Sequence, residues 1–402
     1  MMVHKCDVAI LGGGPAGTAT ALALCKHNPA LSVAIVESSA YERTRVGETL
    51  PPGIRPLLEQ LGVWPAFLQR SYLPAFGTRA AWGSGELHEN EFIFSPHGQG
   101  WHLDRRDVDA LLADQAVQRG AALYTQARVT TYHKQEDGRW HLTVRTQDRG
   151  RLHQSAAFVV DATGRLAVFA RGQGARKVIF DRLVGLFVFF EADPSQQDTS
   201  TLVEAAEAGW WYSALLPDGQ LVVACMSDAD LVRKQRLNTF ERWTRSLNRT
   251  RHTRERLSNA TPRSEPRVYA AHSHRLDSMT GDGWLAVGDA ASTFDPLSSQ
   301  GIFKALRSGI FAAYAVCDTL NGDARALDKY RMLLQQEFKM YLRTWQDYYR
   351  QEQRWADSEF WRRRTGPLVP ISRPIPVGEQ RSGHSQSLSV PEGSPAASKD
   401  SL

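Results

Sequence analysis

Four residues near the N-terminus have the types and the spacing of a dinucleotide-binding turn. In the stretch VAILGGGPAG, Gly12 would make a tight turn, Gly14 would let backbone approach a pyrophosphate, and Gly17 would let the next helix lie close. Glu37 follows Gly17 by 20 residues, where an acidic group should meet a ribose hydroxyl. The sequence therefore predicts a dinucleotide site. The alternative is an ordinary strand, turn and helix followed by a solvated glutamate.

The flanking residues predict the elements that would position this turn. Residues 6–11 are almost wholly apolar and indicate a buried parallel strand, and residues 16–27 have the composition of a helix. The first amides of that helix would face the phosphates. A second apolar run at residues 31–38 leads to Glu37 and indicates the next strand.

Two later stretches add a helix and a strand to this pattern. Residues 102–124 have apolar side chains at helical spacing, and Arg105 stands at the start of that helix. Residues 158–165 form another apolar strand, which ends at Asp161 and turns through Gly164.

The third stretch, residues 283–316, predicts a strand, a loop and a long helix. The strand runs into Asp289, the loop contains Pro296, and the apolar helix opens at Gly301. A helix N-terminus offers amides and a positive dipole to a group that becomes negative. The alternative for Asp289 is a simple helix N-cap.

In these four ordered motifs the chain resembles the FAD-dependent family of flavin monooxygenases, geranylgeranyl reductases and flavin-dependent tryptophan halogenases, over roughly residues 5 to 365. The resemblance implies non-covalently bound FAD. It places Arg105 at the pyrophosphate, Val129 near the adenine and Asp289 at the ribityl chain. The start of the helix at Gly301 would face the isoalloxazine, whose N1/C2 edge becomes negative on reduction.

The stretch RVGETLPPG at residues 45–53 resembles the loop that lies over the flavin in the halogenases. Glu48 is therefore a candidate catalytic residue, and the alternative is a solvated acid in a loop. Trp211 is a second candidate, and the alternative is a residue in the core of a sheet. The residues expected to bind the cofactor are Gly12, Gly14, Pro15, Ala16, Gly17, Glu37, Ser38, Val46, Gly47, Arg105, Val129, Asp161, Gly164, Asp289, Pro296, Gly301 and Ile302.

Two halogenase features are missing. Halogenases need a lysine some thirty residues past this loop, yet no lysine lies between Lys26 and Lys134. The halogenase WxWxIP motif is also not met, because Pro217 stands too far beyond Trp210. We therefore expect no halogenation. With one glycine-rich fingerprint and no separate nicotinamide domain, the electron donor should dock transiently.

The overall likeness is closest to the halogenase-like flavoproteins of the LodB/GoxB type, which mature quinone-containing amino-acid oxidases. It is carried by GGGPAG, VGETLPPG, WWYSALLPDG, GDAASTFDPLSSQGIFKALRSG and YYRQEQRWADSEFWRRR. The likeness implies a monooxygenase that acts on a partner protein, the oxidase precursor, and oxygenates a tryptophan during biogenesis of cysteine tryptophylquinone. A small-molecule aromatic hydroxylase or reductase and a non-catalytic FAD-bound chaperone are the alternatives.

These observations predict an α/β protein with a glutathione-reductase or p-hydroxybenzoate-hydroxylase-like FAD domain, a β-sheet substrate domain and C-terminal helices. We expect the FAD domain at residues 1–50, 100–175 and 278–322 and the substrate domain at 51–99 and 176–277. A helical segment would follow at 323–376 and a disordered tail at 377–402, where large apolar residues are almost absent.

The composition of the chain limits the kinds of partner that we expect. With 42% apolar and 23% charged residues and four scattered cysteines, the chain indicates a reduced cytoplasmic protein with no membrane span. Its charge of +5 indicates a solvated surface rather than a nucleic-acid footprint. His272 and His274 lack a third ligand, so no metal is expected. The late aromatic residues, those between Trp345 and Trp361, should pack inside the protein. The alternative is that some of them form a partner-binding surface.

Overall fold

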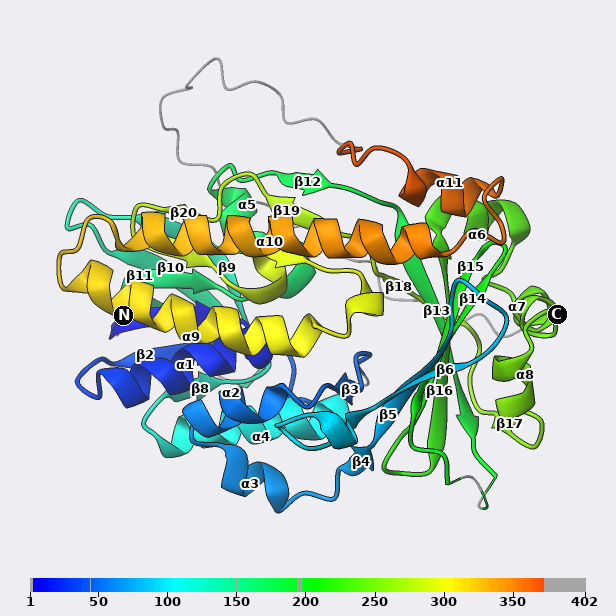
Figure 1. The fold of residues 1–402 in the computed structure, drawn as a ribbon. Helices are drawn as coiled ribbons and strands as arrows, with labels where there is room; N and C mark the ends of the chain where they lie inside the picture. The colour runs from blue at the N-terminus through cyan, green and yellow to red at the C-terminus, as the bar shows by residue number, and fades with distance from the viewer. Residues whose placement is uncertain (1–2, 44, 149, 194, 196, 372–402) are drawn as a thin grey trace, which may run out of the picture.

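The computed structural model describes residues 3–43, 45–148, 150–193, 195 and 197–371. The tail expected at 377–402 lies outside these residues. Figure 1 shows an elongated molecule in which helices cover one large sheet at one end and a second large sheet forms the other end.

The first sheet carries the predicted dinucleotide turn. Its strands are β1 Val3–Leu11, β2 Val33–Val36, β8 Ala122–Tyr124, β9 Ala127–Lys134, β10 Trp140–Thr146, β11 Gly150–Asp161, β20 Thr280–Gly281 and β21 Trp284–Ala286. Their order is β20-β21-β11-β1-β2-β8, and the central pairs are parallel. β10 and β9 add to β11 by antiparallel pairing. The carboxyl ends of the parallel strands therefore lie at one edge of the sheet, where ligands bind in open α/β folds.

Four helices accompany this sheet: α1 Pro15–His27, α4 Arg105–Gln118, α5 Val168–Gly172 and α9 Gly301–Leu320. α1 is buried on almost every side because it lies between the sheet and α9. Gly309 of α9 makes this close packing feasible, since a Cβ there would lie 2.7 Å from the carbonyl oxygen of Ala16. The helix that carries the phosphate-facing amides is thus fixed from both sides.

The second sheet is mostly antiparallel. Its strands are β5 Gly77–Ala81, β6 His88–Glu91, β13 Leu183–Glu191, β14 Thr201–Ala206, β15 Gly209–Leu215, β16 Gln220–Asp228, β17 Thr261–Pro262 and β18 Arg267–Ala270. The order is β17-β13-β16-β15-β14-β5-β6, and β18 also pairs with β13. Three helices pack on one face of it, namely α6 Ala229–Gln235, α7 Phe240–Leu247 and α8 His252–Arg256. Its other face packs on the C-terminal helices.

The other two sheets are small, with three short strands each. One contains β3 Thr49–Leu50, β4 Leu73–Ala75 and β7 Gly100–His102; the other contains β12 Lys177–Ile179, β19 His274–Leu276 and β22 Ser292–Thr293. Short 3-10 turns occur at Phe92–Phe94, Gly164–Leu166, Gly288–Ala290 and Pro296–Ser298. His274 therefore lies in one of these small sheets. Its Nδ1 and Thr293 Oγ1 are 2.7 Å apart and share a hydrogen bond.

The expected boundary at residue 51 needs correction. α2 Ile54–Gln60 and α3 Trp64–Leu68 pack into the core of the first sheet through Ile54, Leu58 and Phe67, not onto the second sheet. Of residues 51–99, β5 and β6 join the second sheet. The sequence did not show which of these segments packs on which sheet, because the cores of both sheets are apolar.

The described part of the C-terminal region forms two helices after α9. α10 spans Ala326–Gln351 and α11 spans Glu359–Thr365. α10 ends at the buried Glu352, which is its C-cap residue. The carboxylate of Glu352 accepts hydrogen bonds from the amide of Gly83 at 2.9 Å and from Arg354. Tyr349, Phe360 and Trp361 are fully buried, so the late aromatic residues pack internally, although Tyr348 is 52% exposed.

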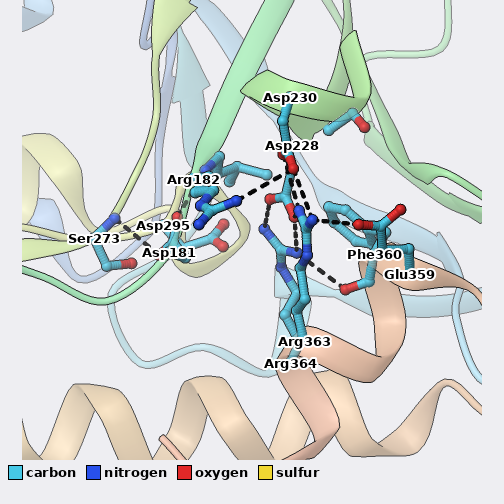
Figure 2. A network of polar contacts seen from close by, with 12 residues as sticks. Asp181, Arg182, Asp228, Asp230, Ser273, Asp295, Glu359, Phe360, Arg363 and Arg364 are labelled. Atoms are coloured by element: carbon cyan, nitrogen blue, oxygen red, sulfur yellow. Dashed lines mark hydrogen bonds and ion pairs between the residues drawn. The ribbon is translucent and has the colours of Figure 1, made fainter. Parts of the chain in front are cut away.

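An ion-pair cluster fixes α11 to the second sheet (Figure 2). Arg364 is 1% exposed and donates to Asp228 Oδ1 at 2.6 Å, and its guanidinium lies 3.6 Å from the ring centroid of Phe360. Arg363 pairs with Asp228 and with Asp230 at 2.7 Å. The last described helix is therefore held by charge pairing at the end of β16.

Candidate FAD site

A cavity of about 750 Å³ lies where the two large sheets meet. This volume falls in the range of about 300–1,000 Å³ typical of ligand pockets. The first sheet and its helices contribute the glycine turn, Glu37 and the start of α9, whereas the second sheet contributes Phe187 and Met226. The cavity therefore joins a nucleotide-type site to a chamber walled by apolar and aromatic side chains.

The glycine turn has the geometry that the sequence predicted. Gly12 has φ +114°, which favours glycine, and a Cβ there would lie 2.2 Å from the carbonyl oxygen of Ala162. A Cβ on Gly17 would lie 1.9 Å from the carbonyl oxygen of Gly12, so this glycine allows the close approach of α1. A Cβ on Gly14 would meet nothing nearer than Arg45 at 3.9 Å, and Gly14 lines the cavity.

Glu37 and two neighbouring charged residues, Arg45 and Asp109, form a polar cluster beside this turn. Glu37 is buried and accepts hydrogen bonds from the amide of Gly13 at 2.7 Å and from Ser39. Arg45 donates to Glu37 at 3.2 Å and to Asp109 at 2.9 Å. Burial acts to raise the pKa of Glu37, but the hydrogen bonds and the Arg45 charge outweigh it and lower this pKa. Glu37 is therefore an ionised acceptor at neutral pH.

Arg105 places a guanidinium group at the wall of the cavity. It begins α4, lines the cavity, and donates to the carbonyl oxygen of Val46 at 3.0 Å and to Asp109 at 3.0 Å. Together, Arg45 and Arg105 place two guanidinium groups at one cavity wall, and guanidinium groups bind phosphate oxygens well. Arg45 was not predicted as a site residue.

Asp289 follows β21 and stands next to a buried lysine. Lys304 Nζ lies 2.8 Å from Asp289 Oδ1, donates to the carbonyl oxygen of Ser292, and lies 4.8 Å from the ring centroid of Phe294. Burial acts to raise the pKa of Asp289, but Lys304 and Arg165 outweigh it and lower the pKa. Asp289 lines the cavity as a carboxylate, suited to accept hydroxyl hydrogens. It is not the N-cap of α9, a position that Gln300 holds.

The loop before α9 closes one side of the cavity. Phe294, Asp295, Pro296 and Ser299 line it, followed by Gly301 and Ile302 in the first turn of α9. α9 has 20 residues and no acidic side chain in its first turn, so its free amides and dipole give the cavity a positive edge. Such an edge would suit a ligand group that carries negative charge.

Glu48 is a buried acid in the cavity wall. It is 3% exposed, and its Oε1 has no hydrogen-bond partner within the described part of the chain. Burial raises the pKa of Glu48 to about 7, against smaller opposing contributions from backbone hydrogen bonds and Arg105. Next to it, Thr49 Oγ1 and Tyr212 Oη lie 2.8 Å apart. A carboxyl group with one unpaired oxygen and a pKa near neutrality is able to hold or release a proton there.

Trp211 requires a correction. It is 1% exposed and packs against Trp243 with ring centroids 5.0 Å apart, on the face of the second sheet that α7 covers. Side chains alternate along β15, so its neighbour Tyr212 lines the cavity instead. The predicted catalytic role of Trp211 is inconsistent with this position.

The other predicted residues divide into wall and support. The residues that line the cavity are Gly12, Gly14, Pro15, Ala16, Glu37, Ser38, Val46, Gly47, Glu48, Arg105, Val129, Gly164, Asp289, Pro296, Gly301 and Ile302. Asp161 and Gly17 do not. Asp161 is fully buried and accepts hydrogen bonds from Thr163 and from the amide of Ala170 at 2.7 Å, so it orders the turn beside the cavity.

The residues present fit FAD. A glycine backbone without side-chain obstruction, two arginines and a carboxylate suit a pyrophosphate, a ribose and a ribityl chain. Glu48 Oε1 and the first amides of α9 supply further polar groups to the cavity. No group of three His, Cys, Asp or Glu side chains that could hold a metal occurs among the described residues.

Comparison with known proteins defines the class. The chain belongs to the FAD binding domain family, whose sequence pattern matches residues 5–333. It binds FAD non-covalently and is an FAD-dependent oxidoreductase of the monooxygenase and halogenase type, with the α/β fold that the sequence predicted.

Its particular likeness is to LodB, an FAD-dependent oxidoreductase of Marinomonas mediterranea. The identity is 30% over 361 residues, 89% of this chain and 96% of LodB. The resemblance to LodB expected from the sequence is confirmed. Among the described residues, no helix has both the length and the apolar character needed to cross a bilayer.

Two solved structures show similar folds. The flavin-dependent halogenase CmlS has a TM-score of 0.79 at 27% identity, over 93% of this chain and 68% of CmlS. QhpG, named as a peptidyl tryptophan dihydroxylase essential for tryptophylquinone cofactor biogenesis, has a TM-score of 0.69 at 24% identity, over 92% of this chain and 80% of QhpG.

Proposed function

We propose that this protein is an FAD-dependent monooxygenase that oxygenates a tryptophan of a partner protein during biogenesis of cysteine tryptophylquinone in an amino-acid oxidase. The observation that carries the proposal is the chamber at the second sheet, where Phe187, Met226, Tyr212 and Tyr269 line the cavity together with the buried acid Glu48. An aromatic ring suits such walls. The likeness to LodB and the fold shared with QhpG support a tryptophan within a protein as the substrate.

Each side chain of this chamber has a separate task in the proposed reaction. Reduced FAD and molecular oxygen supply the oxygenating chemistry. Phe187 and Met226 keep water from the reacting centre, which prevents loss of the oxidising equivalents as hydrogen peroxide. Glu48 takes or returns the proton exchanged at the substrate ring, because its pKa of about 7 keeps both protonation states accessible. Tyr212, paired with Thr49, borders the same space.

The proposal excludes halogenation. Lys304, in α9, pairs through its ammonium with Asp289 and does not line the cavity. A halogenating lysine has to reach the substrate, and none of the lysines that the structure describes lines this chamber. Reduced FAD, oxygen and bromide should therefore leave free tryptophan unchanged in mass. Halotryptophan in that assay would contradict this part of the proposal.

The substrate is tested by expressing an amino-acid oxidase precursor with this protein and weighing its tryptic peptides. We expect the target tryptophan to gain oxygen with the wild-type protein and to remain unmodified with Gly14→Val or Glu48→Gln. Glu91→Gln, on the exposed edge strand β6, is the matched control and should support full modification.

Two other outcomes separate the alternative functions. Modification that proceeds equally with Gly14→Val would contradict the enzymatic role and favour a chaperone. A small-molecule hydroxylase would be favoured if the oxidase matured without this protein and if this protein oxygenated free aromatic compounds. The electron donor is proposed to dock transiently, so reduction should require an added reductase or chemical reductant.

A further inference from the structure

The loop at Phe294–Ser299 is held to α10 by one buried carboxylate. Asp295 is 1% exposed and lines the cavity. Its Oδ2 accepts hydrogen bonds from Trp345 Nε1 at 2.9 Å and from Tyr349 Oη at 2.8 Å, and its Oδ1 accepts from the amide of Leu297 at 2.9 Å. All three contacts end on a single side chain, although Trp345 and Tyr349 lie some fifty residues further along the chain.

The direction of each hydrogen bond is fixed by chemistry. The indole of Trp345 and the amide of Leu297 can only donate. Tyr349 Oη also accepts from Trp210 Nε1 at 2.9 Å, so its own hydrogen is directed to Asp295. Asp295 therefore faces three donors, an arrangement that suits the ionised carboxylate because both of its oxygens only accept.

The same loop is clamped by further contacts to α10. The amide of Asp295 donates to Tyr341 Oη at 2.8 Å, and Tyr341 Oη lies 2.7 Å from Ser273 Oγ. The ring of Tyr341 stacks on Phe294, with centroids 4.0 Å apart and planes 1° from parallel. Phe294 lines the cavity and receives Lys304 over its ring. The position of this wall is thus determined from α10 rather than by the loop itself.

We propose that Asp295 is a positioning residue of the FAD site, which holds the loop at Phe294–Ser299 against α10 and so sets the cavity wall that precedes the first turn of α9. Asp295 acts through Phe294, Pro296 and the start of α9, all of which line the cavity. This inference concerns the cofactor site and holds for any substrate.

Several charged groups face Asp295 and affect its ionisation. Burial raises the pKa of Asp295 to about 6, and the neighbouring carboxylate of Asp181 adds to this effect. The amide of Leu297, the indole of Trp345 and the charge of Arg364 oppose it. Figure 2 shows Asp295 beside Asp181 and Ser273, with Arg364 entering from α11. A proton on Asp295 would face a donor, so one of the three hydrogen bonds would be lost as the pH falls through about 6.

The test measures FAD release from the diluted holoprotein by flavin fluorescence, together with the flavin absorption spectrum. Asp295→Asn places an amide NH₂ against one of the three donors, and Tyr349→Phe removes one donor. Both variants should bind FAD about tenfold more weakly, the change expected for loss of one hydrogen bond to a charged group. Tyr348→Phe is the matched control, because this exposed neighbour does not contact Asp295 through its side chain. Its affinity and spectrum should equal those of the wild type.

The pH dependence separates positioning from mere support of the fold. In the wild type, FAD should be released more readily as the pH falls through about 6. Asp295→Asn should lack this transition, and Tyr349→Phe should move it to higher pH because a donor to the charged form is missing. Folded variants with wild-type FAD affinity and spectrum, or an unchanged transition in Asp295→Asn, would overturn the proposal.

Discussion

Gly14 and Gly17, three residues apart in the sequence, have different roles, and single substitutions should separate them. Gly14 has φ −75° and ψ −175°, which valine tolerates, and its Cβ would point into open cavity space. We expect Gly14→Val to fold, to melt at the temperature of the FAD-free wild type and to contain no FAD, because the side chain fills the pyrophosphate position. Flavin absorbance of the purified protein and circular dichroism measure both properties.

Gly17→Val provides the contrast. Its Cβ would lie 1.9 Å from the carbonyl oxygen of Gly12, so the variant should fail to fold or should melt far below the wild type. A Gly14→Val protein that keeps its flavin, or a Gly17→Val protein as stable as the wild type, would contradict this assignment of roles.

Glu48 should make the stability of the FAD-free protein depend on pH. The pKa is about 7 in the folded protein against 4.5 for the free side chain, so the folded state binds this proton more tightly. The contribution to stability is therefore present below pH 4.5 and is lost as the pH rises through 7. Glu48→Gln lacks this loss and should be more stable than the wild type above pH 7, by about 3 kcal/mol at most.

Urea unfolding at pH 5 and pH 8 measures this difference. The free energy of unfolding of Glu48→Gln relative to the wild type should be larger at pH 8 than at pH 5. Glu91→Gln, on an exposed strand, should show no such change. An equal difference at both pH values for Glu48→Gln would mean that its carboxyl group is not buried as described.

At the scale of elements, the attachment of α11 depends on a buried ion pair. Arg364→Leu leaves Asp228, which is 1% exposed, with Arg363 as its remaining cation. Removing one partner of a buried pair costs about 3–5 kcal/mol, and the remaining partner favours the lower end of this range. Arg362→Leu, an exposed position in the same helix, should cost little. Urea midpoints compare the two variants, and equal midpoints would contradict a stabilising role for the pair.

The sequence predicted local elements better than long-range contacts. The glycine turn was predictable because Gly12, Gly14 and Gly17 act within one strand, turn and helix. The orientation of Trp211 was not, because the run WWY is apolar throughout and only the pairing of β15 with its neighbours decides which side chain enters the cavity. Asp295 and Arg45 also escaped notice, since their partners lie far away in the sequence.

For the whole molecule, the shared cavity predicts a single response to FAD. Gly14 from the first sheet region and Met226 from the second both line it, and α10 packs into both cores through Leu334 and Phe338. FAD at one hundred times its Kd should add about 2.7 kcal/mol to the stability of one cooperative unit. Scanning calorimetry should show one transition that moves to higher temperature with FAD. Two transitions, only one of them moved, would contradict this coupling.

The path of α10 has a consequence for preparing fragments of this protein. The family pattern ends at residue 333, but that position lies inside α10, one residue before Leu334 enters the core of the first sheet. A polypeptide cut there would lose Phe338, Tyr341, Trp345 and Tyr349 and would leave the second sheet with an uncovered apolar face. Such a fragment should aggregate on expression. Fragments designed for crystallisation or binding studies therefore need to extend through α11.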